Sequence, residues 1–155
     1  MKIILFFMLL IPIAMAQPRP TGNVLTDGER TLLFKELAVK EAGLLKNLNT
    51  HVKKCYPSLV AQKSLMDLVS SYRLLTASKE SGTQCTPEQL ACLQNVPLEI
   101  RGEGLSLLKG VHYKEFLIKQ HKLKEQEAES MIIDLKLMLK IPLNSNQEPQ
   151  LFNKS

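Results

Sequence analysis

Apolar residues recur along this chain at intervals of three and four, the spacing of amphipathic helices, and no segment alternates as a strand does. The longest such run covers residues 26–54. It begins with Thr26 and, three residues later, Glu29, the spacing of a capping box in which each side chain binds an amide that the helix leaves unpaired. Pro57 predicts the end of this helix near Cys55, because proline disfavours helical backbone in the residue before it. The apolar face consists of Leu33, Phe34, Leu37, Ala38, Leu44, Leu45, Leu48 and Val52.

A second helix is predicted at residues 58–77. The turn that precedes it is short, so we expect the two helices to pack as antiparallel neighbours. Polar residues at 78–84 then predict a loop. The apolar face of this second helix consists of Ala61, Leu65, Leu68, Tyr72 and Leu75.

The strongest local signal for a helix start lies at residues 86–89. Thr86 is the expected cap, Pro87 lacks the amide that would otherwise stay unpaired, and Gln89 stands at the capping-box position. This short helix should end near Gln94, and Pro97 predicts that an extended segment follows it. Residues 101–104 contain two glycines and predict a turn or the loose start of another helix.

The last part of the chain predicts two more helices. One covers residues 105–120 and is interrupted by Gly110, and the other ends before Pro142. Ile133 and Leu137 lie off the apolar face of that last helix, so it should be apolar nearly all round and the most buried of all. Its apolar face consists of Ala128, Met131, Ile132, Leu135, Met138 and Leu139.

Residues 1–16 have the pattern of a secretory signal peptide, with Lys2 before a short apolar block and a small-x-small cleavage pattern from Ala14 to Ala16. The apolar block is too short to span a membrane. The predicted organisation after cleavage is a flexible lead-in (17–27), a helical bundle domain (28–141) and a disordered tail (142–155). The tail contains the only N-glycosylation pattern, at Asn153. We therefore predict an all-α protein, a secreted four-helix bundle with an additional short helix.

Three cysteines, Cys55, Cys85 and Cys92, would enter an oxidising compartment. An odd number allows one bridge within the chain and leaves one thiol. Within one helix, Cys85 and Cys92 would be about 10 Å apart, too far for a disulfide, so Cys55 should pair with one of them. The remaining cysteine is either a small buried apolar residue or the link of a disulfide-bonded homodimer.

Charge and motifs exclude several function classes. The formal net charge is +5 at pH 7, but no basic run is interleaved with aromatic residues, so we expect no nucleic-acid binding. Nucleophile elbows, P-loops, zinc-binding helices and paired CxxC motifs are absent from the sequence. His51, His112 and His121 are expected on solvated helix surfaces. We therefore predict no enzyme, no metal and no cofactor.

A secretory leader, about 140 further residues, four amphipathic helices, one or two disulfides and no active-site motif together resemble the four-helix-bundle cytokines of the short-chain class. Lys35-Glu36 in a leucine-rich first helix is similar to the interleukin-5 group, and the residues from Cys85 to Glu88 resemble the start of that group's second helix. A cysteine that this group carries after its lysine-rich span is missing here, where Lys124 stands. The resemblance implies a secreted ligand that brings together cell-surface receptor chains.

Under that resemblance the first helix presents a glutamate to a shared receptor chain. The lysine-rich span would meet a second receptor or heparan sulfate, since such charge mainly steers association. The predicted receptor-binding residues are Glu36, Lys40, Glu41, Lys114, Lys119 and Lys122.

A second hypothesis is a secreted helical carrier of lipid or another small apolar ligand. Helical bundles can enclose a cavity between their apolar faces. The residues that would line this cavity are Leu65, Leu68, Met131 and Leu135.

Overall fold

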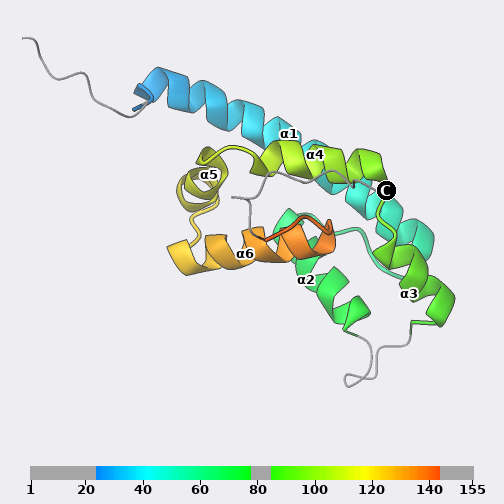
Figure 1. The fold of residues 1–155 in the computed structure, drawn as a ribbon. Coiled ribbons are helices and arrows are strands. Elements are labelled where there is room, and N and C mark those ends of the chain that lie inside the picture. Colours follow the sequence, from blue (N-terminus) through cyan, green and yellow to red (C-terminus); the bar gives the residue numbers. More distant parts are fainter. Residues whose placement is uncertain (1–23, 78–84, 144–155) are drawn as a thin grey trace, which may run out of the picture.

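A computed structural model describes residues 24–77 and 85–143, and the described chain forms six helices and no strand. The all-α prediction is confirmed. The predicted signal peptide, most of the predicted lead-in and nearly all of the predicted tail, with Asn153, lie outside the described residues. The helices are α1 (Asp27–Cys55), α2 (Leu65–Thr76), α3 (Pro87–Gln94), α4 (Leu98–Leu108), α5 (His112–Gln120) and α6 (Glu125–Met138), as Figure 1 shows.

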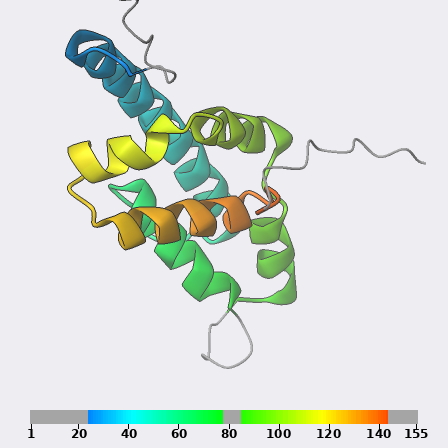
Figure 2. The same ribbon diagram turned by 60° about the vertical axis from the view of Figure 1, so that its left-hand side comes forward.

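The long helix α1 runs along the molecule, and its first turns project beyond the other helices (Figures 1 and 2). It packs against α2, α3, α4 and α5, whereas α6 packs against α2 and α5. Only α1 among the described helices is longer than 14 residues. The core lies between these helices, and its fully buried leucines include Leu44, Leu48, Leu68, Leu117 and Leu135.

Helix α1 begins where the capping box predicts. The Glu29 amide donates to the Thr26 hydroxyl (3.3 Å), and the Thr26 amide donates to the Glu29 carboxylate (2.9 Å). Five of the predicted apolar residues are buried: Phe34, Leu37, Leu44, Leu48 and Val52. The local pattern therefore defined the start of the helix and most of its inner face.

Helix α2 begins seven residues later than predicted. Residues 56–64 form a linker, because the Asn49 side chain on α1 binds the backbone of Gln62 through both its amide and its carbonyl (2.9 Å each). Ser64 then caps the helix. The linker returns along α1, so α2 points in roughly the same direction as α1 in Figures 1 and 2, and the antiparallel prediction was wrong.

Helix α3 has the predicted capping box, but the extended segment predicted after it is wrong. Helix α4 starts at Leu98, directly after Pro97. It includes residues 101–104, for which a turn or the loose start of a helix was predicted, so these residues are helical. Gly104 is buried, and an added Cβ there would lie 2.1 Å from Leu139 Cδ1. The glycine permits close packing against the end of α6, which local sequence could not reveal.

The predicted helix through Gly110 is two helices, α4 and α5, separated by residues 109–111. Lys122 has a φ of 58° and lies in the connection to α6. Helix α6 ends before Pro142 as predicted. Ile133 and Leu137 are exposed, so the expectation that α6 is buried all round was wrong.

A disulfide joins Cys55 to Cys92, with a Cα–Cα distance of 5.5 Å. This confirms the prediction that Cys55 pairs with one of the two later cysteines. The bridge connects the last residue of α1 to α3. Cys85 is unpaired and half-buried, and it packs against the core.

Candidate functional site

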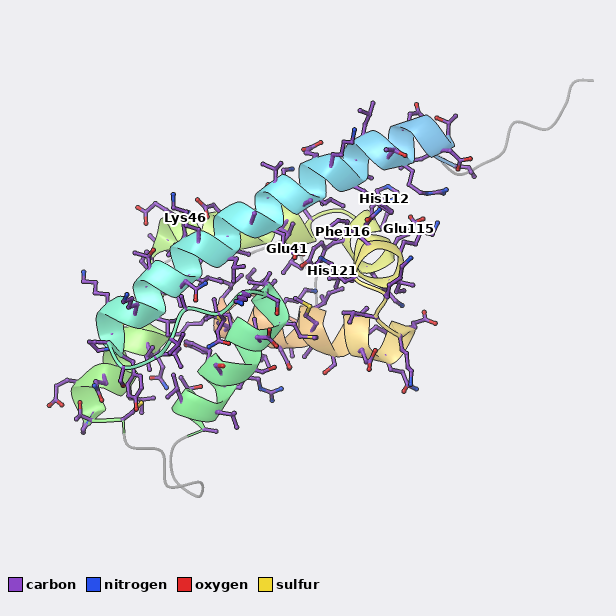
Figure 3. All side chains as sticks on the ribbon, turned by 180° about the vertical axis from the view of Figure 1, so that it is seen from behind. Glu41, Lys46, His112, Glu115, Phe116 and His121 are labelled. Atoms are coloured by element: carbon purple, nitrogen blue, oxygen red, sulfur yellow. A yellow bond between two sulfur atoms is a disulfide. The ribbon has the colours of Figure 1, made fainter. Side chains whose placement is uncertain are left out.

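One side of α1 is not covered by any described helix. Leu32 and Val39 are 67% and 73% exposed, although both are large apolar residues. At about 100° per residue these positions share one side of the helix with Lys35, Ala42 and Lys46, all of them exposed. We call these five residues the outer ridge. Figure 3, which views the molecule from behind, shows α1 in front with Lys46 on it.

An ion pair borders the outer ridge. Lys40 Nζ lies 2.8 Å from Glu36 Oε1, four residues earlier on the helix, and both side chains are exposed. Exposed pairs of this kind contribute only about 0.3–0.5 kcal/mol to stability. A partner could therefore engage either side chain at little cost to the fold. These two predicted receptor-binding residues are placed together on the surface.

Glu41 points inward instead. Its carboxylate accepts a hydrogen bond from the Tyr113 hydroxyl (2.8 Å) and lies 3.0 Å from His121 Nε2, and its side chain is only 12% exposed. Figure 3 shows Glu41 and His121 pointing toward one another between α1 and α5. Burial, and then the charge of Glu41, raise the pKa of Tyr113, so its hydroxyl stays protonated and donates. Glu41 therefore connects α1 to α5 and is mostly buried, whereas Glu36 and Lys40 are exposed.

The predicted lysine-rich surface is largely neutralised by acidic residues. Lys114 binds the carboxylates of Glu125 (2.7 Å) and Glu129, and Lys119 binds Glu115 (2.7 Å). Hydrogen bonds to these glutamates raise the pKa of Lys114 and so retain its charge. Of the three predicted lysines, only Lys122 has no carboxylate partner within the described part of the chain.

Glu115 is the centre of a second charged cluster that the sequence did not predict. Arg30 Nε on α1 lies 3.0 Å from its carboxylate, and His112 Nδ1 lies 3.7 Å away (Figure 3). The hydrogen bond from Lys119 lowers the pKa of Glu115, with the nearby charge of Arg30 adding to the effect. The cluster connects the first turns of α1 to α5. Residues this far apart in sequence carry no local signal of their contact.

A small pocket of about 80 Å³ opens beside Glu41 and His121. Leu65 and Met131 line it, as the carrier hypothesis predicted, but Leu68 and Leu135 are fully buried elsewhere in the core. Sites for drug-sized ligands usually measure about 300–1,000 Å³. The pocket therefore has no room for a lipid chain.

His51 is buried, contrary to the expectation of a solvated residue. Its Nε2 atom lies 4.0 Å from Cys55 Sγ, next to the disulfide. Burial lowers the pKa of His51, and this effect outweighs the contacts with the backbone of Leu93 and Cys92 that raise the pKa. His51 is therefore neutral near pH 7 and part of the packing around the bridge.

Residues 24–77 and 85–143 contain no group of three or more His, Cys, Asp or Glu residues that could hold a metal ion. In the same two segments, no helix has the length and apolar character needed to cross a membrane. The described residues thus provide an exposed helix side and small polar clusters.

The sequence matches no protein-family model. Searches of curated proteins and of solved structures likewise give no significant match.

Proposed function

We propose that this protein is a secreted, non-enzymatic helical ligand of the four-helix-bundle cytokine type, which binds a cell-surface receptor chain through the outer ridge of α1. The observation that supports this most is the exposure of Leu32 and Val39 on a helix whose other side is deeply buried. Contiguous exposed apolar surface with a polar rim marks many protein interaction sites, and the outer ridge places Leu32, Val39 and Ala42 on one side of α1 beside charged residues. The disulfide between Cys55 and Cys92 is consistent with an oxidising compartment.

The spacing on α1 suits a compact contact. Leu32 and Val39 are seven residues apart, about 10 Å along the axis at 1.5 Å per residue. Burying two such side chains contributes about 3–6 kcal/mol before the costs of association. Glu36 lies between Leu32 and Val39 along the helix, at the edge of the outer ridge. Its carboxylate would select the partner through charge. Glu41 has no part in this contact, because its carboxylate is already bound within the molecule.

Bringing two receptor chains together requires a second surface, for which the predicted lysines were Lys114, Lys119 and Lys122. The first two are bound to glutamates, so Lys122 is the one best placed to meet an acidic partner. Heparan sulfate is the rival partner on both surfaces. Lys35 and Lys46 on the outer ridge could bind its sulfates.

Binding of the labelled, secreted protein to a panel of cells tests the outer ridge. We expect Val39→Asp to weaken binding about tenfold or more, because a central apolar contact is lost and a charge is buried. Val60→Asp is the matched control, since Val60 is 78% exposed but lies in the linker after α1. Equal binding by both variants would contradict the proposal. Loss of binding after heparan sulfate is removed from the cells would identify the polysaccharide as the partner instead.

The role of Glu36 has its own test. Glu36→Lys should abolish signalling while the helical circular-dichroism spectrum stays unchanged. The double variant Glu36→Lys/Lys40→Glu restores an ion pair with reversed polarity. If the partner recognises Glu36, the double variant stays inactive. If it signals normally, only the ion pair matters and the receptor role of Glu36 is wrong.

A further inference from the structure

A groove lies between the α4–α5 turn and α6, and its floor is formed by aliphatic side chains. Its volume is about 480 Å³, several times that of the pocket beside Glu41. The helices that form it are nearest to the viewer in Figure 1, whereas α1 is nearest in Figure 3. The aliphatic residues that line the groove include Leu105, Leu108, Ile132 and Ile141. The groove is therefore formed mainly by other helices than α1, which carries the outer ridge.

The apolar character of the groove continues onto the exposed surface. Leu105 is exposed on α4, and Val111 in the following turn is 87% exposed. The volume of the groove lies within the usual range for small-molecule sites, but the exposure of Leu105 and Val111 leaves its edge open to solvent. A segment of another protein could cover the same apolar residues.

The charged side chains that line the groove are all positive. Three lysines line it, and none of the described residues that line it is acidic. Lys114 is bound to Glu125 and Glu129. Lys109 and Lys136 have no carboxylate partner in the described segments. Their charge favours an acidic partner, since complementary charge around an interface steers association and selects partners.

We propose that this groove binds an acidic amphipathic helix of a partner protein. The described residues contain no strand, so there is no sheet edge on which an extended peptide could form backbone hydrogen bonds. Binding must come from side chains. An amphipathic helix places apolar residues at intervals of three and four against the floor and keeps its acidic residues beside Lys109 and Lys136. The inference does not depend on the receptor proposal for α1.

The test uses a fluorescein-labelled helical peptide with leucines on one side and glutamates on the others. Its control carries lysines in place of the glutamates. Fluorescence polarisation with the disulfide-bonded protein should show at least about tenfold tighter binding of the glutamate peptide. Lys109→Glu/Lys136→Glu should weaken that binding about tenfold, and Leu105→Glu should do the same by placing a charge among the aliphatic residues that line the groove. Lys35→Glu/Lys46→Glu, on the outer ridge, is the matched control and should bind normally.

Several results would overturn the inference. Equal binding of both peptides would show that the lysines do not select the partner, and equal weakening by the control variant would indicate a general charge effect. Displacement by a twelve-carbon fatty acid would identify an apolar anion as the occupant. Displacement by a peptide of residues 144–155 would identify the chain's own C-terminal segment. Self-association by sedimentation, abolished by Leu105→Glu, would indicate a second copy of the chain.

Discussion

Two glycines on α4 have opposite environments. An added Cβ at Gly102 would meet nothing within 4 Å, whereas one at Gly104 would lie 2.1 Å from the buried side chain of Leu139. Both glycines lower the intrinsic helix propensity of α4 by about 1 kcal/mol relative to alanine. Only at Gly104 is this loss offset by packing, because the absence of a side chain lets α4 approach Leu139 at the end of α6.

Substituting each glycine by alanine should therefore change stability in opposite directions. We expect Gly102→Ala to raise the free energy of unfolding by about 0.5–1 kcal/mol. Gly104→Ala should lower it by about 1–2 kcal/mol, because displacing Leu139 in a packed core costs more than the gain in helix propensity. Chemical denaturation monitored by circular dichroism measures both. Equal shifts in the two variants would mean that Leu139 moves aside freely.

His51 makes stability depend on pH. Burial lowers its pKa in the folded chain, whereas in the unfolded chain it is near its ordinary value of about 6.5. Below that pH the unfolded chain binds a proton that the folded chain does not. The contribution of neutral His51 is thus complete above pH 6.5 and is lost progressively as the pH falls.

We expect the free energy of unfolding to fall between pH 7 and pH 5, with a slope of up to about 1.4 kcal/mol per pH unit from this one residue. His51→Gln should flatten the slope, since glutamine does not titrate. Denaturation curves at pH 7.0, 6.0 and 5.0 provide the measurement. The same slope in both proteins would assign the pH dependence to other groups. Glu115 is a poor candidate for a pH dependence in this range. Its pKa is lowered in the folded chain, so its contribution to the free energy of unfolding is lost only at more acidic pH.

At the scale of helices, the sequence predicted ends that depend on local chemistry. The capping boxes at Thr26 and Thr86 fixed the starts of α1 and α3, since both partners lie within three residues. The start of α2 was missed because Asn49 binds the backbone of Gln62 and keeps the linker out of the helix. The start of α4 was missed because Pro97 predicts an extended segment, whereas the helix begins directly after it.

The candidate site follows the same division. The contact between Glu36 and Lys40 can be predicted from the sequence because it depends only on helical spacing. The inward orientation of Glu41 depends on Tyr113 and His121, which are more than 70 residues away. No local pattern contains such a contact. Lys114 likewise looked like a surface charge until α6 brought its acidic partners to it.

Two asparagines on α1 test how the linker is held. Asn49→Ala should lower the free energy of unfolding by about 1–3 kcal/mol, because it leaves the partly buried backbone groups of Gln62 unpaired. Asn47→Ala is the control. Asn47 donates to the Glu103 carboxylate on α4 (2.8 and 2.9 Å), but both groups are exposed and return to water, so the loss should be below about 1 kcal/mol. Similar losses would contradict a special role for the linker contact.

At the scale of the whole molecule, the core and the two proposed surfaces are separate. The buried side of α1 contacts four helices, while its outer ridge is exposed. The groove is formed by α4, α5, α6 and the residues after α6. Variants on one surface should therefore leave the other intact, which makes two independent partners compatible with one fold. Neither Cys55 nor Cys92 belongs to the outer ridge or lines the groove, so we expect the disulfide to contribute to stability rather than to recognition.

That bridge closes a loop with a sequence separation of 37 residues. In the chain-entropy account, a loop of this length restricts the unfolded chain by about 4 kcal/mol. Cys55→Ser/Cys92→Ser should lower the free energy of unfolding by about 2–4 kcal/mol, and a reducing agent should have a similar effect on the unaltered protein. Cys85→Ser is the control and should change stability by less than about 1 kcal/mol, because Cys85 is unpaired and half-buried.

Guanidinium denaturation with and without reductant, together with non-reducing intact mass, distinguishes the outcomes. A monomer that loses stability on reduction fits a bridge within one chain. A disulfide-linked dimer that disappears only in the Cys85→Ser variant would show that Cys85 joins two chains while Cys55 and Cys92 stay paired. If the Cys55→Ser/Cys92→Ser variant is as stable as the unaltered protein, packing alone holds α3 against the end of α1. In that case His51, Leu93 and Val52, all buried at this end of the molecule, supply the contact energy that we assign to the bridge.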